Sequence, residues 1–319
     1  MKKKLLFTFW ISFMLFFICL VFLYSSNISS IVIYSINIFI KNIFPSLFPM
    51  FIISYVLVNI GIPHFIGNMF SKLFTKVFKV KKEASFIFLM SLITGFPSSS
   101  KNACEMIDKK IFNEKDAEKV LMFTFFANPL FIINTVGNIF LNSKMMGFII
   151  FISHILGNIF VGIIFRNKKP IYTDCKKVTL KDTNRNLYKD FNKKNIIFLI
   201  FNAIKNAIDV LFSVFGIITF FLILTSLICN VFSLNDYCKT FLSSVLEMTT
   251  GLKNLSLLNI DINTKAVLSS MIISFGGLSV HSQIMSILEN KKVKYAPFFF
   301  SRIVHSLFSG FITFILLVL

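Results

Sequence analysis

The sequence predicts an all-α polytopic membrane protein, on the grounds of its composition and the length of its apolar runs. Of its 319 residues, 55% are hydrophobic and only 15% are charged, whereas about a quarter of the residues of a soluble domain are charged. Several uncharged apolar runs reach roughly 18 residues or more, the length of helix that crosses the hydrocarbon core of a bilayer. The runs are continuous rather than alternating in polarity, which excludes a transmembrane β-barrel.

The excess of basic residues, 33 Lys and Arg against 14 Asp and Glu, fits a membrane protein better than a nucleic-acid-binding one. These residues lie between the apolar runs rather than along one helix face, as expected for loops on the cytoplasmic side. With the N-terminus in the cytoplasm, the segments that would lie inside hold most of them. The lipid bilayer is therefore an expected partner, and no nucleic acid is expected.

The first part of the chain is expected to form a single helix followed by a repeat. Residues 1–26 are an N-terminal transmembrane helix, because Leu5–Tyr24 is uncharged and longer than the apolar core of a secretory signal. Residues 27–165 form the first repeat. In it, Ala84–Phe96 is apolar but too short to span, so we expect a re-entrant hairpin that returns to its own side. The crossings expected in this repeat are Ile43–Ile60, Leu121–Leu141 (interrupted at Asn128-Pro129) and Met146–Phe165.

A hydrophilic, basic linker, residues 166–195, separates this repeat from a second one, residues 196–319. The halves share an order of features: Thr94-Gly95 corresponds to Thr250-Gly251, each at the break of a short hairpin. Each repeat has three crossings and one re-entrant hairpin, and an odd number of crossings inverts the second repeat relative to the first. With the N-terminal helix, seven crossings are expected. Those of the second repeat are Val210–Phe232, Ala266–Leu288 and Phe298–Leu319.

Inverted repeats with paired broken helices indicate a transport site near the middle of the membrane. A helix that stops there exposes unpaired backbone groups, which are tolerated only beside protein, water or a ligand. At the first hairpin tip, the hydroxyls of Ser98, Ser99 and Ser100 and the ammonium of Lys101 would suit a carboxylate at a helix N-terminus. A turn that faces solvent is the alternative for this tip. Asn128 could offer its amide to a substrate, or it could simply mark a packing kink.

The second half offers a matching set of substrate-binding candidates. Thr249 and Thr250 mirror the first hairpin tip. Gly276, Gly277 and Ser279 could bring backbone close to a ligand, although small residues also serve tight helix–helix packing.

Three further polar residues of the second half are candidates. Gln283 follows the Gly276 break by one to two turns. Glu247 could carry a coupled H⁺ or Na⁺, because ionisable groups in a membrane usually face a cavity; an interfacial carboxylate is the alternative. Arg302 could hold a substrate carboxylate with its planar fork, or it could extend to the inner surface.

No enzyme is expected, because the sequence contains no Walker A, G-x-S-x-G or HExxH motif. The five cysteines form no CxxC pair and no Cys/His cluster at metal-ligand spacing. No cofactor or metal is therefore expected beyond the coupling ion.

Four ordered motifs resemble those of the sporulation integral membrane proteins of the YlbJ or SpoVV family. They are Gly95–Lys101, Asn128-Pro129, Leu246–Gly251 and Ser274–Gln283. The resemblance covers nearly the whole chain from about residue 30. It implies a nucleoside-recognition gate domain and an architecture similar to that of concentrative nucleoside transporters. The chain departs from the pattern at Ser98–Ser100, where a Gly-Ala pair is usual, and this puts the substrate contacts there in doubt.

The resemblance also implies a function. It implies a protein of the outer forespore membrane that moves dipicolinic acid, a small aromatic dianion, from the mother cell towards the forespore by alternating access. A nucleoside-type transporter is one alternative, and a non-transporting scaffold of the spore envelope is another. The expected partners are a small anionic substrate and the bilayer, and a homo-oligomer is left open.

Overall fold

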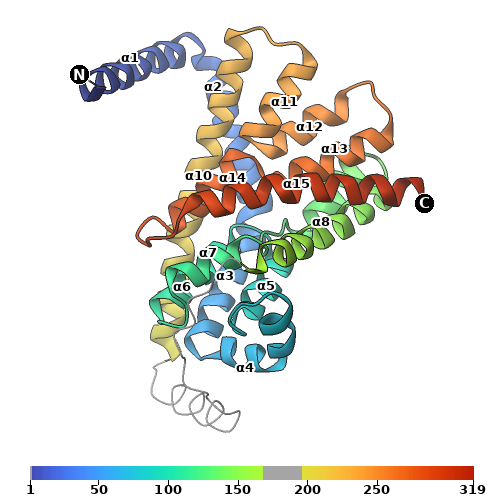
Figure 1. Ribbon diagram of the computed structural model, residues 1–319. Helices are drawn as coiled ribbons and strands as arrows, with labels where there is room; N and C mark the ends of the chain where they lie inside the picture. The colour runs from blue at the N-terminus through green and yellow to red at the C-terminus, as the bar shows by residue number, and fades with distance from the viewer. Residues whose placement is uncertain (1, 168–195) are drawn as a thin grey trace.

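The computed structural model describes residues 2–167 and 196–319, and every regular element in these residues is a helix (Figure 1). The predicted all-α class is therefore confirmed for the described part of the chain. Nearly all of the predicted linker, residues 168–195, lies outside the described residues.

The chain opens with a series of helices that turn sharply into one another. These are α1 (Lys2–Leu23), α2 (Ser25–Ile38), the π-helical η1 (Phe39–Ile43) and α3 (Phe44–Asn59). The axis bends by 49° between α2 and α3. Pro45 lies in the first turn of α3 and Pro49 inside it, and the missing N–H groups of these two prolines explain the local departure from straight α-helix.

The first broken hairpin follows two short helices. The elements are α4 (Ile62–Met69), η2 (Leu73–Val77), α5 (Ala84–Thr94) and α6 (Ser98–Asp108). Helix α5 ends because Gly95 has a φ of +83°, a conformation that glycine adopts without steric cost. A Cβ at Gly95 would lie 2.6 Å from the backbone nitrogen of Asn128. The predicted break at Gly95 therefore also serves a close approach to the next broken helix.

The predicted span Leu121–Leu141 is not a single helix. It consists of the end of α7 (Glu114–Leu121), a stretch with no helix at residues 124–128, and the π-helical η3 (Phe131–Phe140). Side chains from other helices satisfy the backbone of this stretch: Asn158 donates to the Phe125 carbonyl, and His154 Nε2 accepts from the Ala127 N–H at 3.0 Å. Because buried backbone groups need partners, these side chains allow a much longer interruption than the kink that the sequence predicts.

The rest of the chain forms long helices and a second broken hairpin. The elements are α8 (Lys144–Ile164), η4 (Phe165–Asn167), α10 (Ile196–Val231), α11 (Asp236–Leu246), α12 (Met248–Leu257), α13 (Ile262–Phe275), α14 (Gly277–Ile287) and α15 (Tyr295–Val318). Glu247 alone separates α11 from α12, and Gly276, with a φ of +90°, separates α13 from α14. The predicted break at Gly276 is present. The second hairpin is also broken, but at Glu247: Thr250-Gly251, which were expected at the break, lie inside α12.

Four of the described helical segments are long and apolar enough to cross a membrane, and the bent pair of α2 and α3 would make a fifth. The chain is therefore a multi-pass membrane protein by length and composition. Seven crossings were expected. Counted with α2, α3 supplies the fifth. The two expected crossings that are not among these segments are Leu121–Leu141, which is broken, and the N-terminal helix of residues 1–26, where the structure has α1. The four segments are Lys144–Asn167, Ile196–Val231, Ile262–Ile287 and Tyr295–Val318.

The core joins the two halves of the chain. The largest buried cluster contains Phe86 of α5 and Met106 of α6 together with Val280 of α14 and Phe298 of α15. Figure 1 shows α10 running along most of the molecule and α15 lying beside α8. The first hairpin thus packs against second-half helices, and the ends of the broken helices meet inside the protein.

Candidate functional site

A cavity of roughly 500 Å³, here called the main cavity, lies between the two halves. Its walls come from α2, η1, the start of α3, the end of α5, η3, the middle of α10, the α11–α12 break and α14. Four of the predicted site residues line it: Asn128, Glu247, Thr249 and Gln283. The structure therefore brings together polar residues from both predicted repeats, at the ends of interrupted helices.

Asn128 lies at the end of the non-helical stretch after α7 and connects it to α3, to the end of α5 and to the start of the following helix. Its Oδ1 accepts hydrogen bonds from the N–H groups of Leu130, at 2.8 Å, and Phe131, at 3.4 Å, so it caps η3. Its Nδ2 donates to Ser46 Oγ and to the Thr94 carbonyl, both at 3.2 Å. The amide thus satisfies the end of α5 and the start of η3 while it lines the cavity.

Glu247 occupies the break of the second hairpin and caps α12. Its two carboxylate oxygens accept hydrogen bonds from the N–H groups of Thr249, at 3.2 Å, and Thr250, at 2.8 Å. A negative charge at a helix N-terminus is favourable because the helix dipole is positive there. The residue is only 4% exposed. The carboxylate predicted to bind a coupling ion is therefore held by the start of its own helix, and Thr250 does not line the cavity.

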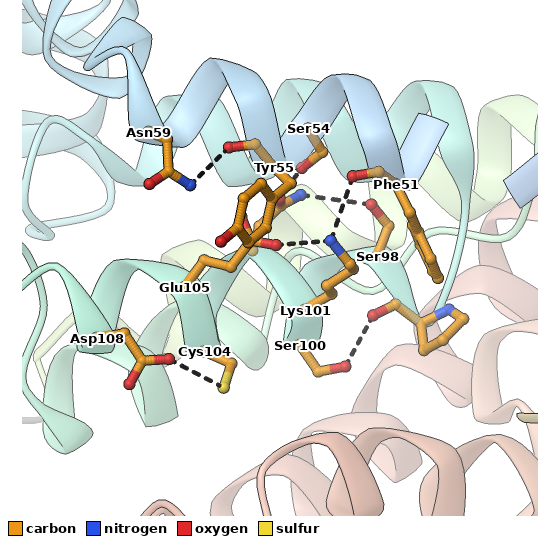
Figure 2. Close-up of polar contacts among 12 residues, drawn as sticks. Phe51, Ser54, Tyr55, Asn59, Ser98, Ser100, Lys101, Cys104, Glu105 and Asp108 are labelled. Atoms are coloured by element: carbon orange, nitrogen blue, oxygen red, sulfur yellow. Dashed lines mark hydrogen bonds and ion pairs between the residues drawn. The ribbon is translucent and has the colours of Figure 1, made fainter. Parts of the chain in front are cut away.

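The three serines of the first hairpin tip begin α6 as expected, but none lines the main cavity. Figure 2 shows Ser98 and Ser100 at the start of this helix. Ser98 Oγ accepts from Asn102 Nδ2 at 3.4 Å, and Ser100 Oγ donates to the Pro97 carbonyl at 2.7 Å. All three serines are buried, and Ser99 Oγ is buried without a hydrogen-bond partner. The solvent-facing alternative for this tip is therefore wrong, because the tip is packed inside the protein.

Lys101 lies beside a different cavity. This second cavity, of roughly 470 Å³ and here called the α6 cavity, is lined by α3, α6, α10 and α14. The Lys101 ammonium donates to Glu105 Oε1 at 2.6 Å and to the Phe51 carbonyl at 3.2 Å (Figure 2). Its charge is thus matched within α6, and it holds α6 to α3.

The residues around the α13–α14 break are packed tightly. A Cβ on Gly276 would lie 2.5 Å from the ring of Phe125, and one on Gly277 would lie 3.0 Å from the backbone nitrogen of Met248. Ser279 Oγ accepts a 3.4 Å hydrogen bond from Gln283 Nε2. This geometry favours the packing role that small residues serve between helices, and of this group only Gln283 reaches the main cavity.

Arg302 is fully buried in α15 and lines neither cavity. Its guanidinium donates to the Met122 carbonyl and to Asn158 Oδ1, the latter at 3.3 Å, and it stacks at 4.7 Å from the ring centre of Phe125. Among the described residues, no carboxylate forms a salt bridge with it. Arg302 therefore braces the non-helical stretch after α7, and it is not an inner-surface residue.

Sequence reasoning did not identify several polar residues that line the main cavity. They are Tyr34, Lys41, Ser46, Thr94, Asn134 and Thr135. Their position in otherwise apolar runs was the available signal, but α2 and η3 had not been placed beside the breaks. Lys41 and Glu247 are the only charged residues among the described lining, so the cavity is overall neutral and rich in amides and hydroxyls.

Comparison with known proteins gives a family match and a relative. Residues 40–144 match the Gate family, described as nucleoside recognition. Over 295 residues the chain is 27% identical to the sporulation integral membrane protein YlbJ of Bacillus subtilis. The aligned region covers 84% of this chain and 72% of YlbJ. The chain is a homologue of YlbJ. No solved structure matches it.

The Gate match includes most of the first-half wall of the main cavity, all but Tyr34 and Ile38 of α2. Lys41, Ser46, Thr94 and Asn128 all lie within the matched residues. Glu247 and the other second-half lining residues lie outside the Gate match but within the half that completes the cavity.

Proposed function

We propose that this YlbJ homologue is a secondary transporter that moves dipicolinic acid, a small aromatic dicarboxylate, across the outer forespore membrane of a sporulating cell. The observation that carries the proposal is the main cavity: roughly 500 Å³, lined by apolar side chains and a set of amide and hydroxyl groups, and enclosed by both halves at the ends of interrupted helices. Pockets of this size hold small molecules. Interrupted helices at membrane depth are tolerated where they line such a cavity.

The order of elements supports alternating access by two inverted repeats. Each half contains a short broken hairpin (α5–α6, α11–α12), then a broken helix (α7–η3, α13–α14), then a long last helix (α8, α15). In an inverted pair, each half can open the shared site to one side of the membrane in turn. The N-terminus would lie in the cytoplasm, in line with the basic loops.

The lining suggests how the substrate is held. The Lys41 ammonium would pair with one carboxylate, and the amides of Gln283 and Asn134 would donate to the other. The rings of Phe96 and Phe131 also line the cavity and would stack on the aromatic ring of the substrate. The Glu247 carboxylate would not contact the substrate carboxylates, because its oxygens accept hydrogen bonds from the N–H groups at the start of α12.

One observation favours a nucleoside as the alternative substrate. The cavity is neutral overall and rich in amide and hydroxyl groups, which suits an uncharged ligand with many hydrogen-bonding groups, and the matched domain is described as nucleoside recognition. A non-transporting scaffold would have no need of the lining at all.

Dipicolinate flux in proteoliposomes tests these alternatives. We expect the wild type to transport dipicolinate, and Lys41→Ala and Gln283→Ala to reduce the flux by about tenfold, because each removes a hydrogen bond to a charged group. Lys144→Ala, which removes an exposed lysine outside the cavity, is the matched control and should leave the flux unchanged.

Competition identifies the substrate. Uptake of a labelled nucleoside that excess dipicolinate does not inhibit would replace the dipicolinate proposal with the nucleoside one. Absence of flux for both solutes in the wild type would favour a scaffold.

A further inference from the structure

The α6 cavity lies next to the main cavity along two shared helices. On α10, Ser213 lines the α6 cavity and Val214 lines the main cavity. On α14, Ser286 lines the α6 cavity and Gln283, one turn earlier, lines the main cavity. The two cavities therefore follow each other through the protein, about one helical turn apart.

A thin barrier separates them. Ser213 Oγ and Ser286 Oγ are hydrogen-bonded at 3.0 Å and join α10 to α14. Phe51 of α3 is fully buried beside Leu211 of α10, and its carbonyl holds the Lys101 ammonium (Figure 2). Events in the α6 cavity are thus one layer of side chains away from the main cavity.

Two buried oxygen atoms of residues that line the α6 cavity accept no hydrogen bond from the protein. They are Glu105 Oε2 and Asn206 Oδ1. Glu105 is only 8% exposed, and its salt bridge to Lys101 uses Oε1 and leaves Oε2 unmatched. A buried acceptor without a partner costs about 1–3 kcal/mol, so a site that holds two of them is suited to a positively charged ligand.

The charges around Glu105 also favour a cation. Asp108 and Asp209 line the same cavity, and Asp108 is paired with Lys291 from the α14–α15 loop. The Lys101 ammonium is directed to α3, where it lies 5.1 Å from the ring centre of Phe51 and 5.6 Å from that of Tyr55. The titratable groups that line the cavity together with Glu105 are Lys101, Cys104 and Asp108 of α6, Lys109 just after it, Tyr55 of α3 and Asp209 of α10.

The available ligands indicate the class of cation. Carboxylate and amide oxygens suit hard cations. Among the described residues, no group of three His, Cys, Asp or Glu side chains could hold a metal ion, which argues against a tightly bound divalent or transition metal. A monovalent cation or a proton remains.

We propose that the α6 cavity is a binding site for a small monovalent cation, sodium or a proton, held by Glu105 Oε2 and Asn206 Oδ1. The site is coupled to the main cavity because Glu105 also holds Lys101, which fastens α6 to α3 at the barrier. This coupling rests on the proposed transport function, but the binding itself does not. The proposal thus assigns the ion to Glu105 rather than to Glu247, the carboxylate that the sequence suggested, whose two oxygens each accept a hydrogen bond from the start of α12.

Binding of radioactive sodium to the purified full-length protein in nanodiscs tests the site without any solute. We expect binding that excess sodium chloride displaces and choline chloride does not, and a decrease in affinity of at least about tenfold in Glu105→Gln, which removes a charged ligand. Asn206→Leu keeps the Lys101–Glu105 pair intact and should also weaken binding, which guards against a simple folding defect in Glu105→Gln. Glu289→Gln, an exposed acid outside both cavities, is the matched control.

Gradient-driven flux in proteoliposomes distinguishes the two cations. If sodium does not bind, a pH gradient should drive solute flux in the wild type and fail to do so in Glu105→Gln. Wild-type protein that binds no sodium and whose flux ignores both gradients would overturn the proposal while leaving the transport function intact. Sodium binding equal to wild type in both variants would also overturn it. If the variants lose sodium binding and the wild type shows no solute flux, the cation site is supported and the proposed transport function is contradicted.

Discussion

Glu247 and Asn128 each do two things: their side chains cap the start of a helix, and they line the main cavity. Each accepts hydrogen bonds from two backbone N–H groups at the start of a helix. In a membrane, where no bulk water can satisfy such groups, losing a cap is costly. These residues therefore stabilise the interruptions in the helices. A substitution at either of them is expected to affect substrate binding partly by changing the backbone conformation at the interruption.

The cap at Glu247 leads to a prediction about stability. Glu247→Ala removes both acceptors and should destabilise the protein by about 1 kcal/mol, which lowers Tm by roughly 2–4 °C in a chain of this size. Glu247→Asp should recover most of this loss, because aspartate is among the favoured capping residues. Thermal denaturation in detergent measures both. Equal Tm values for wild type and Glu247→Ala would show that the carboxylate does not support α12.

The sequence identified where the helices break, but not what the residues at the breaks do. Gly95 and Gly276 are local signals and interrupt helices as expected. The Asn128-Pro129 signal marks the end of the non-helical stretch 124–128, and Pro129 begins the next helix, whereas Thr250-Gly251 lies inside α12 rather than at a break. Whether Glu247 faces a ligand or its own helix depends on backbone angles at a single residue, which no local pattern specifies. The burial of Arg302 depends on the Met122 carbonyl, which is far away in the chain, so it could not be predicted from the local sequence either.

The broken elements of one half are completed by side chains of other helices. The stretch after α7 depends on Asn158 and His154 of α8 and on Arg302 of α15. His154 Nδ1 in turn lies 2.9 Å from Ser274 Oγ, next to the α13–α14 break. Two breaks are thus joined through one buried network, so movement at one break is expected to be felt at the other.

The barrier between the two cavities gives a prediction at the scale of elements. We expect the contact between α10 and α14 to open there during alternating access, because it closes the barrier between the two cavities. In a background with the native cysteines replaced by serine, the pair Ser213→Cys and Ser286→Cys replaces two hydroxyls that lie 3.0 Å apart, which is close enough for a disulfide. Oxidation should reduce solute flux by about tenfold or more, and reduction should restore it.

A second serine pair supplies the control for this cross-link. Ser270 Oγ and Ser309 Oγ lie 2.6 Å apart, between α13 and α15, and line neither cavity. Cross-linking the corresponding cysteines should leave the flux close to that of the reduced protein. Equal inhibition by both cross-links, or by neither, would mean that the α10–α14 contact is not the moving barrier.

At the scale of the whole molecule, the basic segments gather at one end. The Lys81 ammonium pairs with Asp116 at 2.8 Å, and Lys291 pairs with Asp108, so the loop before α5, the α6–α7 region and the α14–α15 loop are joined. The pKa of Lys119 at this end is lowered to about 8, mainly because the ammonium is partly buried and to a smaller extent because the positive charge of Lys79 is nearby. Folding therefore brings together positive segments that are far apart in the sequence.

This clustering predicts the orientation of the protein in the membrane. Segments rich in Lys and Arg stay on the cytoplasmic side, so the α14–α15 loop should lie inside. The 36-residue α10 leads away from that end, over a rise of about 54 Å if straight, so the α10–α11 loop should lie outside. Cys238 just beyond that loop is exposed, as is Asn290 in the α14–α15 loop.

Labelling with a membrane-impermeant maleimide measures this orientation. Two single-cysteine proteins are compared, one that keeps only Cys238 and one that carries only Asn290→Cys. In a non-sporulating host that carries the protein in its cytoplasmic membrane, Cys238 should react in intact cells, and the Asn290→Cys protein should react only after the cells are permeabilised. The reverse pattern would place the basic end outside and contradict the cytoplasmic N-terminus. Reaction of both in intact cells would mean that α10 does not carry the chain across the membrane, and the main cavity would then no longer lie on a route between the two sides.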